Sequence, residues 1–360
     1  MNIHPLVLIQ NIIFKRPLYI VFFITSKCNA HCPFCFYWRN IESYSKRNEL
    51  SLPEIEILTH NFPGLLHLNI TGGEPFLRVD ISEICHLFIK NCAVQSLTIP
   101  TNCSLPEKIE NDVVAILKKS EPRYMRICLS LHGVGKIHDD MLGVQGGFAR
   151  VIETYERLNL IRKRYKNLDI QITSCLSSCN ANYMDELIDY VAQHFEVGHH
   201  NILLVRGKPR DSHMKDVLPA KYKYFVEKVK KNPIEKKNLI SAIYAAIFKY
   251  NNKVIEHLLT YNTMPISCVA GRRLLVIDDE GMVFPCEVLG EALGSLRENG
   301  FSVDRILSSL SARKILKEIQ DKKCACSYEC AIQMSIVFNW RCWFGVLKEL
   351  FRGKRSICKT

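Results

Sequence analysis

The chain has 360 residues, 48% of them hydrophobic, and a formal net charge of +12. A chain of this length and hydrophobicity can bury one large core or two modest ones, so the composition excludes a disordered protein. Its basic residues are dispersed along the sequence, and no recognisable RNA-binding module accompanies them. Nucleic acid is therefore not the expected partner.

The N-terminal segment, residues 1–15, is apolar but is interrupted by polar residues and by Pro5. No small-residue cleavage site precedes the first strand-like run, so we expect neither a signal peptide nor a membrane-spanning helix. The chain also has sixteen cysteines, many at ligand-like spacings, which favours a protein of the reducing cytoplasm over a disulfide-bonded secreted one. Cysteines within apolar segments are expected to be small buried hydrophobes, namely Cys85, Cys92, Cys128 and Cys175.

Residues 16–210 alternate short β-branched or apolar runs with longer amphipathic runs, a pattern typical of βα units around a parallel sheet. Six such units imply an α/β fold, either an open partial barrel or a doubly wound sheet. The predicted strands are 18–25, 66–71, 95–101, 124–131, 168–175 and 201–205. Capping boxes are expected at three helix starts, Ser51 with Glu54, Asp80 with Glu83, and Ser104 with Glu107.

The alternation ends near residue 210. Residues 211–265 are Lys-rich and predict a helical linker. Residues 266–335 predict a small unit with a β-hairpin across 278–281, where Gly281 permits the tight turn, and a helix around 302–319. Residues 336–360 form a basic amphipathic tail.

Three cysteines, Cys28, Cys32 and Cys35, lie in one loop directly after the first predicted strand. Structural zinc needs four ligands, whereas three thiolates on a [4Fe–4S] cubane leave one iron open to an exogenous ligand. A zinc site would need His31 as its fourth ligand. The second predicted strand ends in Gly72, Gly73, Glu74 and Pro75, so both motifs lie at the carboxyl ends of strands, where α/β sheets place their sites.

These residues resemble the radical S-adenosylmethionine (SAM) superfamily, whose Cys-x3-Cys-x2-Cys loop matches the three cysteines, with the aromatic Phe34 before the last. The resemblance implies a partial (β/α)6 TIM-like barrel. It also implies that the open iron binds SAM, which is cleaved reductively to a 5′-deoxyadenosyl radical that abstracts hydrogen. In the family, the Gly-Gly-Glu-Pro segment holds the methionine amino group through backbone carbonyls and the glutamate. Its glycines would let the backbone approach the ligand.

Two later strand ends are weaker matches to the family. Asn102 stands where the family often has Thr-Asn-Gly, but Cys103 replaces the glycine. Ser130 opens a segment that resembles Ser-x-Asp-Gly beside the SAM ribose or carboxylate, but His132 replaces the aspartate. The alternative for each is a plain turn at the end of a strand.

The later cysteines resemble the SPASM or Twitch extension of radical SAM enzymes, which opens with a cysteine and, after roughly a dozen residues, Gly-x4-Cys. The complete SPASM run of four further cysteines is absent, so the resemblance implies one auxiliary [4Fe–4S] cluster. Five thiols are candidates, and we expect Cys268, Cys286, Cys326 and Cys330 as ligands, with Cys324 as the alternate. Structural zinc is the competing interpretation.

The substrate is less defined by the sequence. Arg206 could anchor a carboxylate or phosphate, and Glu287, next to a cysteine, could accept a proton. The resemblance implies a ribosomal peptide or a small molecule as substrate and a donor such as flavodoxin or ferredoxin for the electron. RNA-modifying or lipid- or sugar-modifying radical SAM enzymes remain alternatives, as does a non-catalytic zinc-binding interaction protein. We expect a cytoplasmic enzyme, and the two ends of the chain could contact a membrane surface.

Overall fold

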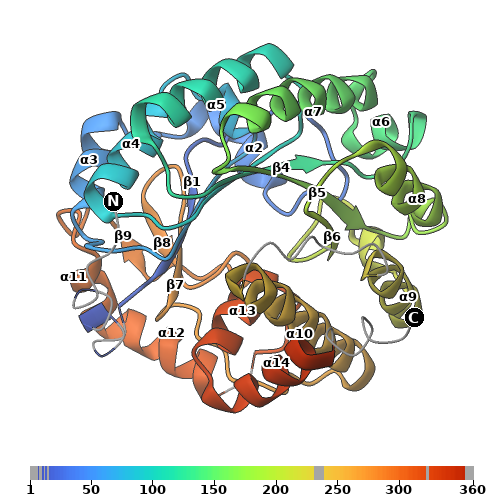
Figure 1. Ribbon diagram of the computed structural model, residues 1–360. Helices are drawn as coiled ribbons and strands as arrows, with labels where there is room; N and C mark the ends of the chain where they lie inside the picture. Colours follow the sequence, from blue (N-terminus) through green and yellow to red (C-terminus); the bar gives the residue numbers. More distant parts are fainter. Residues whose placement is uncertain are drawn as a thin grey trace.

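Figure 1 shows the computed structural model of the chain, which describes residues 7, 10, 11, 13, 16–230, 239–321 and 324–352. Most of the predicted N-terminal segment, the basic run 231–238 and the last eight residues of the tail lie outside the described residues. No helix of the described residues is long and apolar enough to cross a membrane.

The described strands form one sheet of nine, in the order β6-β5-β4-β3-β2-β1-β7-β8-β9. The six strands β1 to β6 and the added β7 are parallel, and β8 and β9 are antiparallel. Their bounds are β1 Tyr19–Phe23, β2 His67–Thr71, β3 Leu97–Thr101, β4 Met125–Ser130, β5 Leu168–Leu176, β6 His199–Leu204, β7 Leu274–Ile277, β8 Met282–Phe284 and β9 Gly294–Ser295. The six predicted strands are therefore confirmed.

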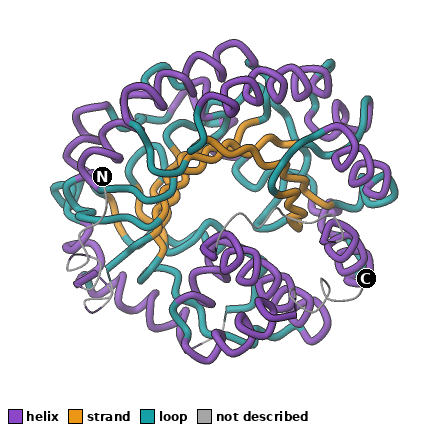
Figure 2. The backbone as a smooth tube through the Cα atoms, viewed as in Figure 1, coloured by secondary structure: helices purple, strands orange, loops and turns teal. Residues whose placement is uncertain are grey.

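The sheet curves into an arc but does not close, so the partial-barrel fold is confirmed (Figure 2). Helices cover its convex face, as expected of parallel strands that are buried on both sides. They are α3 Leu52–Thr59, α4 Ile81–Cys92, α5 Pro106–Ser120, α7 Gly147–Arg164 and α8 Met184–His194. Shorter helices lie at the ends of strands, namely α2 Trp38–Glu42, η1 Tyr44–Lys46, η2 Pro75–Leu77, α6 Lys136–Leu142 and η3 Ser212–Lys215.

A helical group lies across the opening of the arc, between β7 and β6 (Figure 1). In it α10, Leu239–Tyr261, packs against α13, Glu329–Val337, and α14, Trp340–Arg352. Helix α9, Pro219–Lys230, lies beside β6. The inner face of β1 and β7 packs on α13 through a small apolar cluster that includes Val21, Phe23, Tyr328 and Met334.

The C-terminal hairpin differs from the predicted small unit in one respect. Its strand β7 pairs in parallel with β1, so the hairpin extends the main sheet instead of forming a sheet of its own. The turn lies at 278–281 as predicted, with Gly281 at φ +85°, a conformation that glycine adopts without strain. The predicted helix around 302–319 is two helices, α11 Val303–Ser308 and α12 Leu310–Asp321, because the backbone is extended at Ser309.

The three predicted capping boxes have different outcomes. Ser51 and Glu54 form theirs at the start of α3. Asp80 makes no capping bond because Arg78 binds its carboxylate, with Nε 2.7 Å from Oδ1. Ser104 does not cap α5, whose N-cap is Leu105, and its hydroxyl instead contacts Asn29. The last two predictions were therefore wrong, because Asp80 and Ser104 bind other side chains instead of the helix N-terminus.

Candidate functional site

The three cysteines of the first loop lie together beyond the carboxyl end of β1, and all are half-buried. Burial raises the pKa of Cys28 to about 12 and also raises the pKa values of Cys32 and Cys35. The neighbouring thiols add to the shifts of Cys28 and Cys32, so the three sulfurs are near one another. Thiols with raised pKa values stay protonated until an electrophile such as a metal replaces the proton.

Two other loops hold this thiol loop in place. The backbone N–H of His31 donates to the carbonyl of Leu142, at 2.9 Å, where α6 ends. On the other side Arg210 and Asp211 donate their backbone N–H groups to the carbonyls of Cys35 and Pro33, at 3.1 and 2.9 Å. The loop is therefore fixed by backbone hydrogen bonds from segments more than 100 residues away.

The glycine pair after β2 packs directly on the thiol loop. Gly73 donates to the carbonyl of Thr25 at 2.8 Å, and Glu74 donates to that of Lys27 at 2.7 Å. A Cβ atom on Gly72 would lie 2.4 Å from the Thr25 oxygen, and one on Gly73 would lie 2.1 Å from the Lys27 oxygen. Contact between the two loops therefore requires glycine at both positions. The sequence predicted a different purpose for these glycines, to let the backbone approach the ligand, and the structure adds this second one.

The Glu74 carboxylate is 1% exposed and joins the ends of β2 and β3. It accepts hydrogen bonds from Thr101 Oγ1 at 2.9 Å, from the Asn102 N–H at 2.7 Å and from the Phe76 N–H at 3.2 Å. Burial raises its pKa to about 7, although these bonds oppose the shift. A carboxylate has about four acceptor positions, so about one remains for a ligand.

Asn102 also contacts the thiol loop, since its amide nitrogen lies 3.0 Å from Asn29 Oδ1 and 4.0 Å from Cys28 Sγ. Cys103, in the place of the family glycine, has φ +63°. That left-handed conformation is costly for a residue with a side chain, which explains why glycine is favoured at this position. Cys103 is held in it by a bond from its N–H to Thr101 Oγ1.

The end of β4 faces the thiol loop through His132. Its ring meets that of Phe34 edge-on, with centroids 4.8 Å apart, and its Nδ1 accepts from the Cys175 N–H at 3.1 Å. Burial holds the pKa of His132 well below its usual range, so the ring is neutral. Ser130 is the last residue of β4 and is half-buried.

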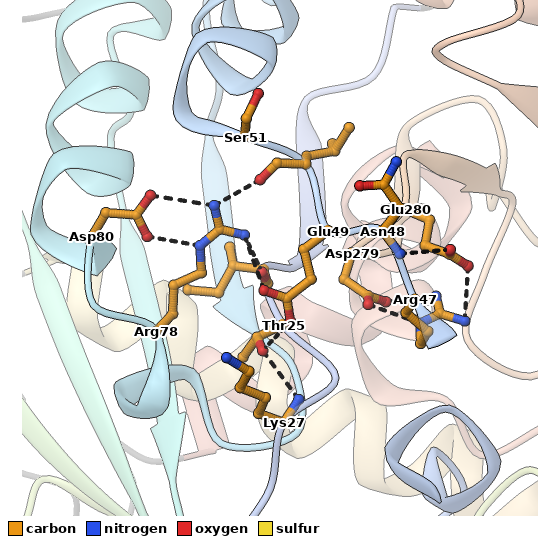
Figure 3. A network of polar contacts seen from close by, with 12 residues as sticks. Thr25, Lys27, Arg47, Asn48, Glu49, Ser51, Arg78, Asp80, Asp279 and Glu280 are labelled. Carbon is orange, nitrogen blue, oxygen red and sulfur yellow. Dashed lines mark hydrogen bonds and ion pairs between the residues drawn. The ribbon is translucent and has the colours of Figure 1, made fainter. Parts of the chain in front are cut away.

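A polar network surrounds the carboxyl end of β1 and extends to the hairpin (Figure 3). Arg78 donates to the carbonyls of Ile24 and Leu50 at 2.6 and 2.7 Å. Glu49 accepts from Thr25 Oγ1 at 2.5 Å. Across the loop, Arg47 binds the hairpin carboxylates of Asp278, Asp279 and Glu280 at 2.6 to 3.0 Å.

The second cysteine set is gathered at the far end of the hairpin. The pKa of Cys268 is raised to about 12 by burial and by the thiols of Cys326, Cys286 and Cys324. Cys268, Cys324 and Cys326 line one small cavity with apolar neighbours from α13. Cys330 lies to one side, where its sulfur accepts a hydrogen bond from Tyr19 Oη at 3.2 Å.

The two predicted substrate contacts bind each other. The guanidinium of Arg206, just after β6, lies 2.6 Å from the carboxylate of Glu287, which follows Cys286. The guanidinium also lies over the rings of Phe36 and Tyr328, with 5.3 and 5.0 Å to the centroids. The pair therefore connects the first thiol loop with the segment after the hairpin that contains Cys286.

Sequence reasoning missed several residues on the inner face of the sheet. Cys175, expected to be a plain buried hydrophobe, lies near enough to Cys32, Cys35 and Arg206 for their charges to act on one another. Asn201 of β6 binds the carboxylate of Glu329 at 3.0 Å. The alternation of side chains along β5 and β6 could have placed Cys175 and Asn201 on one face, but no sequence signal paired Asn201 with Glu329.

The two groups of cysteines have the arrangement expected of ligands to iron–sulfur clusters. Among the described residues, no three His, Cys, Asp or Glu side chains converge on a point where one metal ion would sit. Thiolates on a cubane each bind a different iron, so they need not converge in that way. Three mutually close thiols at one site, and four or five at the other, match that chemistry.

Comparison with known proteins agrees with this geometry. Residues 22–168, which contain the thiol loop and the Gly-Gly-Glu turn, match the family model described as the radical SAM superfamily. The chain carries a radical SAM domain. It is therefore an enzyme, and the alternative of a non-catalytic zinc-binding interaction protein was wrong. A radical SAM domain implies a [4Fe–4S] cluster and SAM.

Two curated relatives illustrate the range of this superfamily. The AdoMet-dependent heme synthase of Oleidesulfovibrio alaskensis is 23% identical over 77% of this chain and 71% of its own length. The antilisterial bacteriocin subtilosin biosynthesis protein AlbA of Bacillus subtilis is 28% identical over 41% of this chain and 31% of its own length.

Two solved structures share the fold. Streptococcus suis SuiB bound to its precursor peptide SuiA superposes with a TM-score of 0.61 and 18% identity, over 90% of this chain and 72% of that one. The enzyme anSMEcpe with bound AdoMet gives a TM-score of 0.57 and 16% identity, over 95% of this chain and 99% of that one. At these identities the likeness establishes the fold alone.

Proposed function

We propose that this radical SAM enzyme binds its catalytic [4Fe–4S] cluster through Cys28, Cys32 and Cys35 and abstracts hydrogen from a peptide or small-molecule substrate. The observation that supports it best is the direct packing of Gly73 and Glu74 on the thiol loop, with backbone hydrogen bonds of 2.8 and 2.7 Å. When bound, the cluster and SAM supply a 5′-deoxyadenosyl radical.

The residues around the thiol loop have distinct roles in this proposal. Glu74, with about one acceptor position left, holds the SAM amino group together with backbone carbonyls of Gly72 and Gly73, and Pro75 fixes the exit of the turn. Asn102 and Ser130, at the ends of β3 and β4, contact the remainder of SAM. Phe34 packs on His132 and keeps the third thiol in position.

An auxiliary [4Fe–4S] cluster is the second part of the proposal. Cys268, Cys286 and Cys326 supply three ligands, and Cys324 or Cys330 supplies the fourth. The cavity shared by Cys268, Cys324 and Cys326 supports this assignment, because its other lining residues are mainly apolar. A protein-ligated cluster here would accept the substrate electron after hydrogen abstraction.

The substrate proposal follows from the relatives named above. SuiB binds a precursor peptide, and AlbA is named for bacteriocin biosynthesis, so a ribosomal peptide is our leading candidate and a small molecule the second. Arg206 and Glu287 are weak catalytic candidates, because each already neutralises the other. A flavodoxin or ferredoxin would deliver the first electron. RNA and lipid or sugar substrates remain alternatives, which salt-sensitive RNA binding or turnover of those substrates would support.

Contact with a membrane surface is a separate proposal that rests on α14. Trp340, Phe344, Leu347 and Phe351 are exposed at a spacing of four, three and four residues, so they share one face of the helix. Arg341 and Lys348, also exposed, flank them. A helix face of large apolar and cationic side chains suits the interface of an anionic bilayer.

The decisive experiment is reductive cleavage of SAM by protein reconstituted and reduced without oxygen. The wild-type chain should release 5′-deoxyadenosine, and alanine at Cys28, Cys32 or Cys35 should abolish the release. Alanine at Cys85, a buried thiol of α4, is the control and should leave the release unchanged. Equal product formation with and without the three thiols would refute the proposal.

A further inference from the structure

Buried polar side chains on β6, on α9 and at the start of α13 have unused hydrogen-bonding capacity. Within the described residues, buried atoms without a partner include Asn201 Oδ1, Glu329 Oε1, Tyr222 Oη and Tyr328 Oη. Buried polar groups are normally hydrogen-bonded, because leaving one unpaired costs about 1–3 kcal/mol. Four such atoms on the elements that close the open side of the barrel call for a ligand that pairs with them.

Two of these atoms belong to side chains that bind each other. Asn201 Nδ2 donates to Glu329 Oε2 at 3.0 Å, so the second oxygen of each side chain, Asn201 Oδ1 and Glu329 Oε1, is left as an acceptor. A carboxylate only accepts, which fixes the orientation of the amide. Asn201 is 8% exposed and Glu329 is 5% exposed. The pair is therefore a built, buried site for a donor.

The site lies beside the first thiol loop. The guanidinium of Arg206 lies over the ring of Phe36, next to Cys35, with 5.3 Å to the centroid, and over the ring of Tyr328, next to Glu329, with 5.0 Å. Arg206 thus lies between the loop that would hold the catalytic cluster and the residue before Glu329. A substrate group bound by the pair would lie in the part of the barrel where hydrogen abstraction takes place.

The local charges favour a cation. Arg206 carries a positive charge and lies over the ring of Tyr328, the residue before Glu329, with 5.0 Å to the centroid. Its guanidinium, however, is already bound by Glu287 at 2.6 Å. Arg206, Glu287 and Glu329 carry one positive and two negative charges when ionised, so one carboxylate has no counter-ion among them. Glu329 lies in the first turn of α13, and its Oε1 has no hydrogen-bond donor among the described residues.

We propose that Asn201 and Glu329 bind an ammonium group of the substrate. This inference deepens the proposed function, on which it rests, by assigning the substrate a primary amine near the carbon that loses hydrogen. An ammonium group supplies three N–H donors and one positive charge, which match two adjacent acceptors and the unmatched carboxylate. The amine could belong to a lysine side chain of a peptide or to an amino sugar.

The test measures ligand binding by thermal unfolding of the full chain, reconstituted without oxygen and saturated with SAM. The probes are Nα-acetyl-lysine amide and glucosamine, and their neutral controls are Nα,Nε-diacetyl-lysine amide and N-acetylglucosamine. We expect at least one amine to raise the Tm of the wild-type chain and neither neutral probe to do so. Lysine amide alone would indicate a peptide substrate, and glucosamine alone an amino sugar.

The matched variants decide whether the site is the one named. Glu329→Gln keeps the shape of the side chain and should weaken binding of the active amine at least tenfold. Asn201→Leu is the second variant, which tests the same site if Glu329→Gln folds poorly, and it should weaken binding equally. Glu349→Gln, at a buried carboxylate bound by Lys253, is the control and should bind the amine as the wild type does.

A Tm unchanged by both amines, an equal rise with the neutral probes, or undiminished binding by Glu329→Gln and Asn201→Leu would each overturn the proposal. Release of 5′-deoxyadenosine is measured separately on the wild-type chain without probe. Failure of the proposed radical chemistry can therefore be told apart from failure of the amine site.

Discussion

The hydroxyl of Tyr37 donates a 2.8 Å hydrogen bond to Asp279 Oδ1. Tyr37 lies two residues after Cys35, and Asp279 lies in the turn of the hairpin that leads to Cys286. Arg47 binds the same carboxylate, so the turn is held by one neutral and one charged donor. This relationship joins the first thiol loop to the hairpin turn across 242 positions of sequence.

Tyr37→Phe is predicted to loosen this connection without creating a cavity. The variant should lose about 1.5–3 kcal/mol of stability, the usual range for a hydrogen bond to a charged group. Thermal or denaturant unfolding measures the loss of stability. A smaller release of 5′-deoxyadenosine by the variant would show that the thiol loop depends on the Tyr37–Asp279 hydrogen bond. Tyr44→Phe, at an exposed ring nearby, is the control and should behave as the wild type does. Identical unfolding of both variants would contradict the prediction.

SAM binding is predicted to depend on the ionisation of Glu74. Its pKa is raised to about 7 by burial, so the carboxylate that would hold the SAM ammonium is mostly neutral at pH 6 and mostly ionised at pH 8. The dissociation constant for SAM should therefore fall about tenfold between these values, with iron content held constant. Glu74→Gln should bind SAM weakly and with no such dependence. A wild-type constant that does not change with pH would refute the role of the carboxylate.

The same shift predicts the sign of a stability effect. The folded pKa of Glu74 lies above its ordinary value of 4.5, so the native state holds the proton more tightly than the unfolded chain does. Stability then falls as pH rises from about 4.5 to 7, by up to about 3 kcal/mol at about 1.4 kcal/mol per pKa unit. Unfolding of wild type and Glu74→Gln at pH 5 and 8 checks it, and Glu74→Gln should show the smaller loss. A larger loss of stability between pH 5 and 8 in Glu74→Gln than in the wild type would contradict this prediction.

Local patterns explain why much of the fold and the first site could be predicted. The run Tyr19–Phe23 is apolar at every position because both faces of its strand are buried, and the cysteine spacing lies within one loop. The pairing of β7 with β1 and the Asn201–Glu329 bond could not be predicted, since each joins segments more than 100 residues apart. Asp80 and Ser104 failed as caps because other side chains bind them, Arg78 two residues before Asp80 and Asn29 of the thiol loop beside Ser104.

The exposed face of α14 is predicted to bind anionic vesicles. Trp340 and Phe344, each 69% exposed, would insert at the interface, and Arg341 and Lys348 would attract the headgroups. The wild-type chain should float with vesicles that contain phosphatidylglycerol and not with pure phosphatidylcholine. A Trp340→Ser, Phe344→Ser double variant should lose flotation, whereas Tyr183→Ser, at the exposed tyrosine that precedes α8, should keep it. Flotation unaffected by the double variant would exclude this face.

The fourth ligand of the auxiliary cluster can be identified by comparing two variants. Cys324 lines the cavity shared with Cys268 and Cys326, whereas the sulfur of Cys330 accepts a hydrogen bond from Tyr19 and lies near Arg206 and Glu287. We therefore expect Cys324→Ala to lose the auxiliary cluster's iron after anaerobic reconstitution and Cys330→Ala to keep it. Iron and sulfide analysis measures both, with Cys342→Ala as the control at a buried thiol of α14. The opposite pattern would assign the fourth position to Cys330 and would require the start of α13 to turn toward the hairpin when the cluster binds.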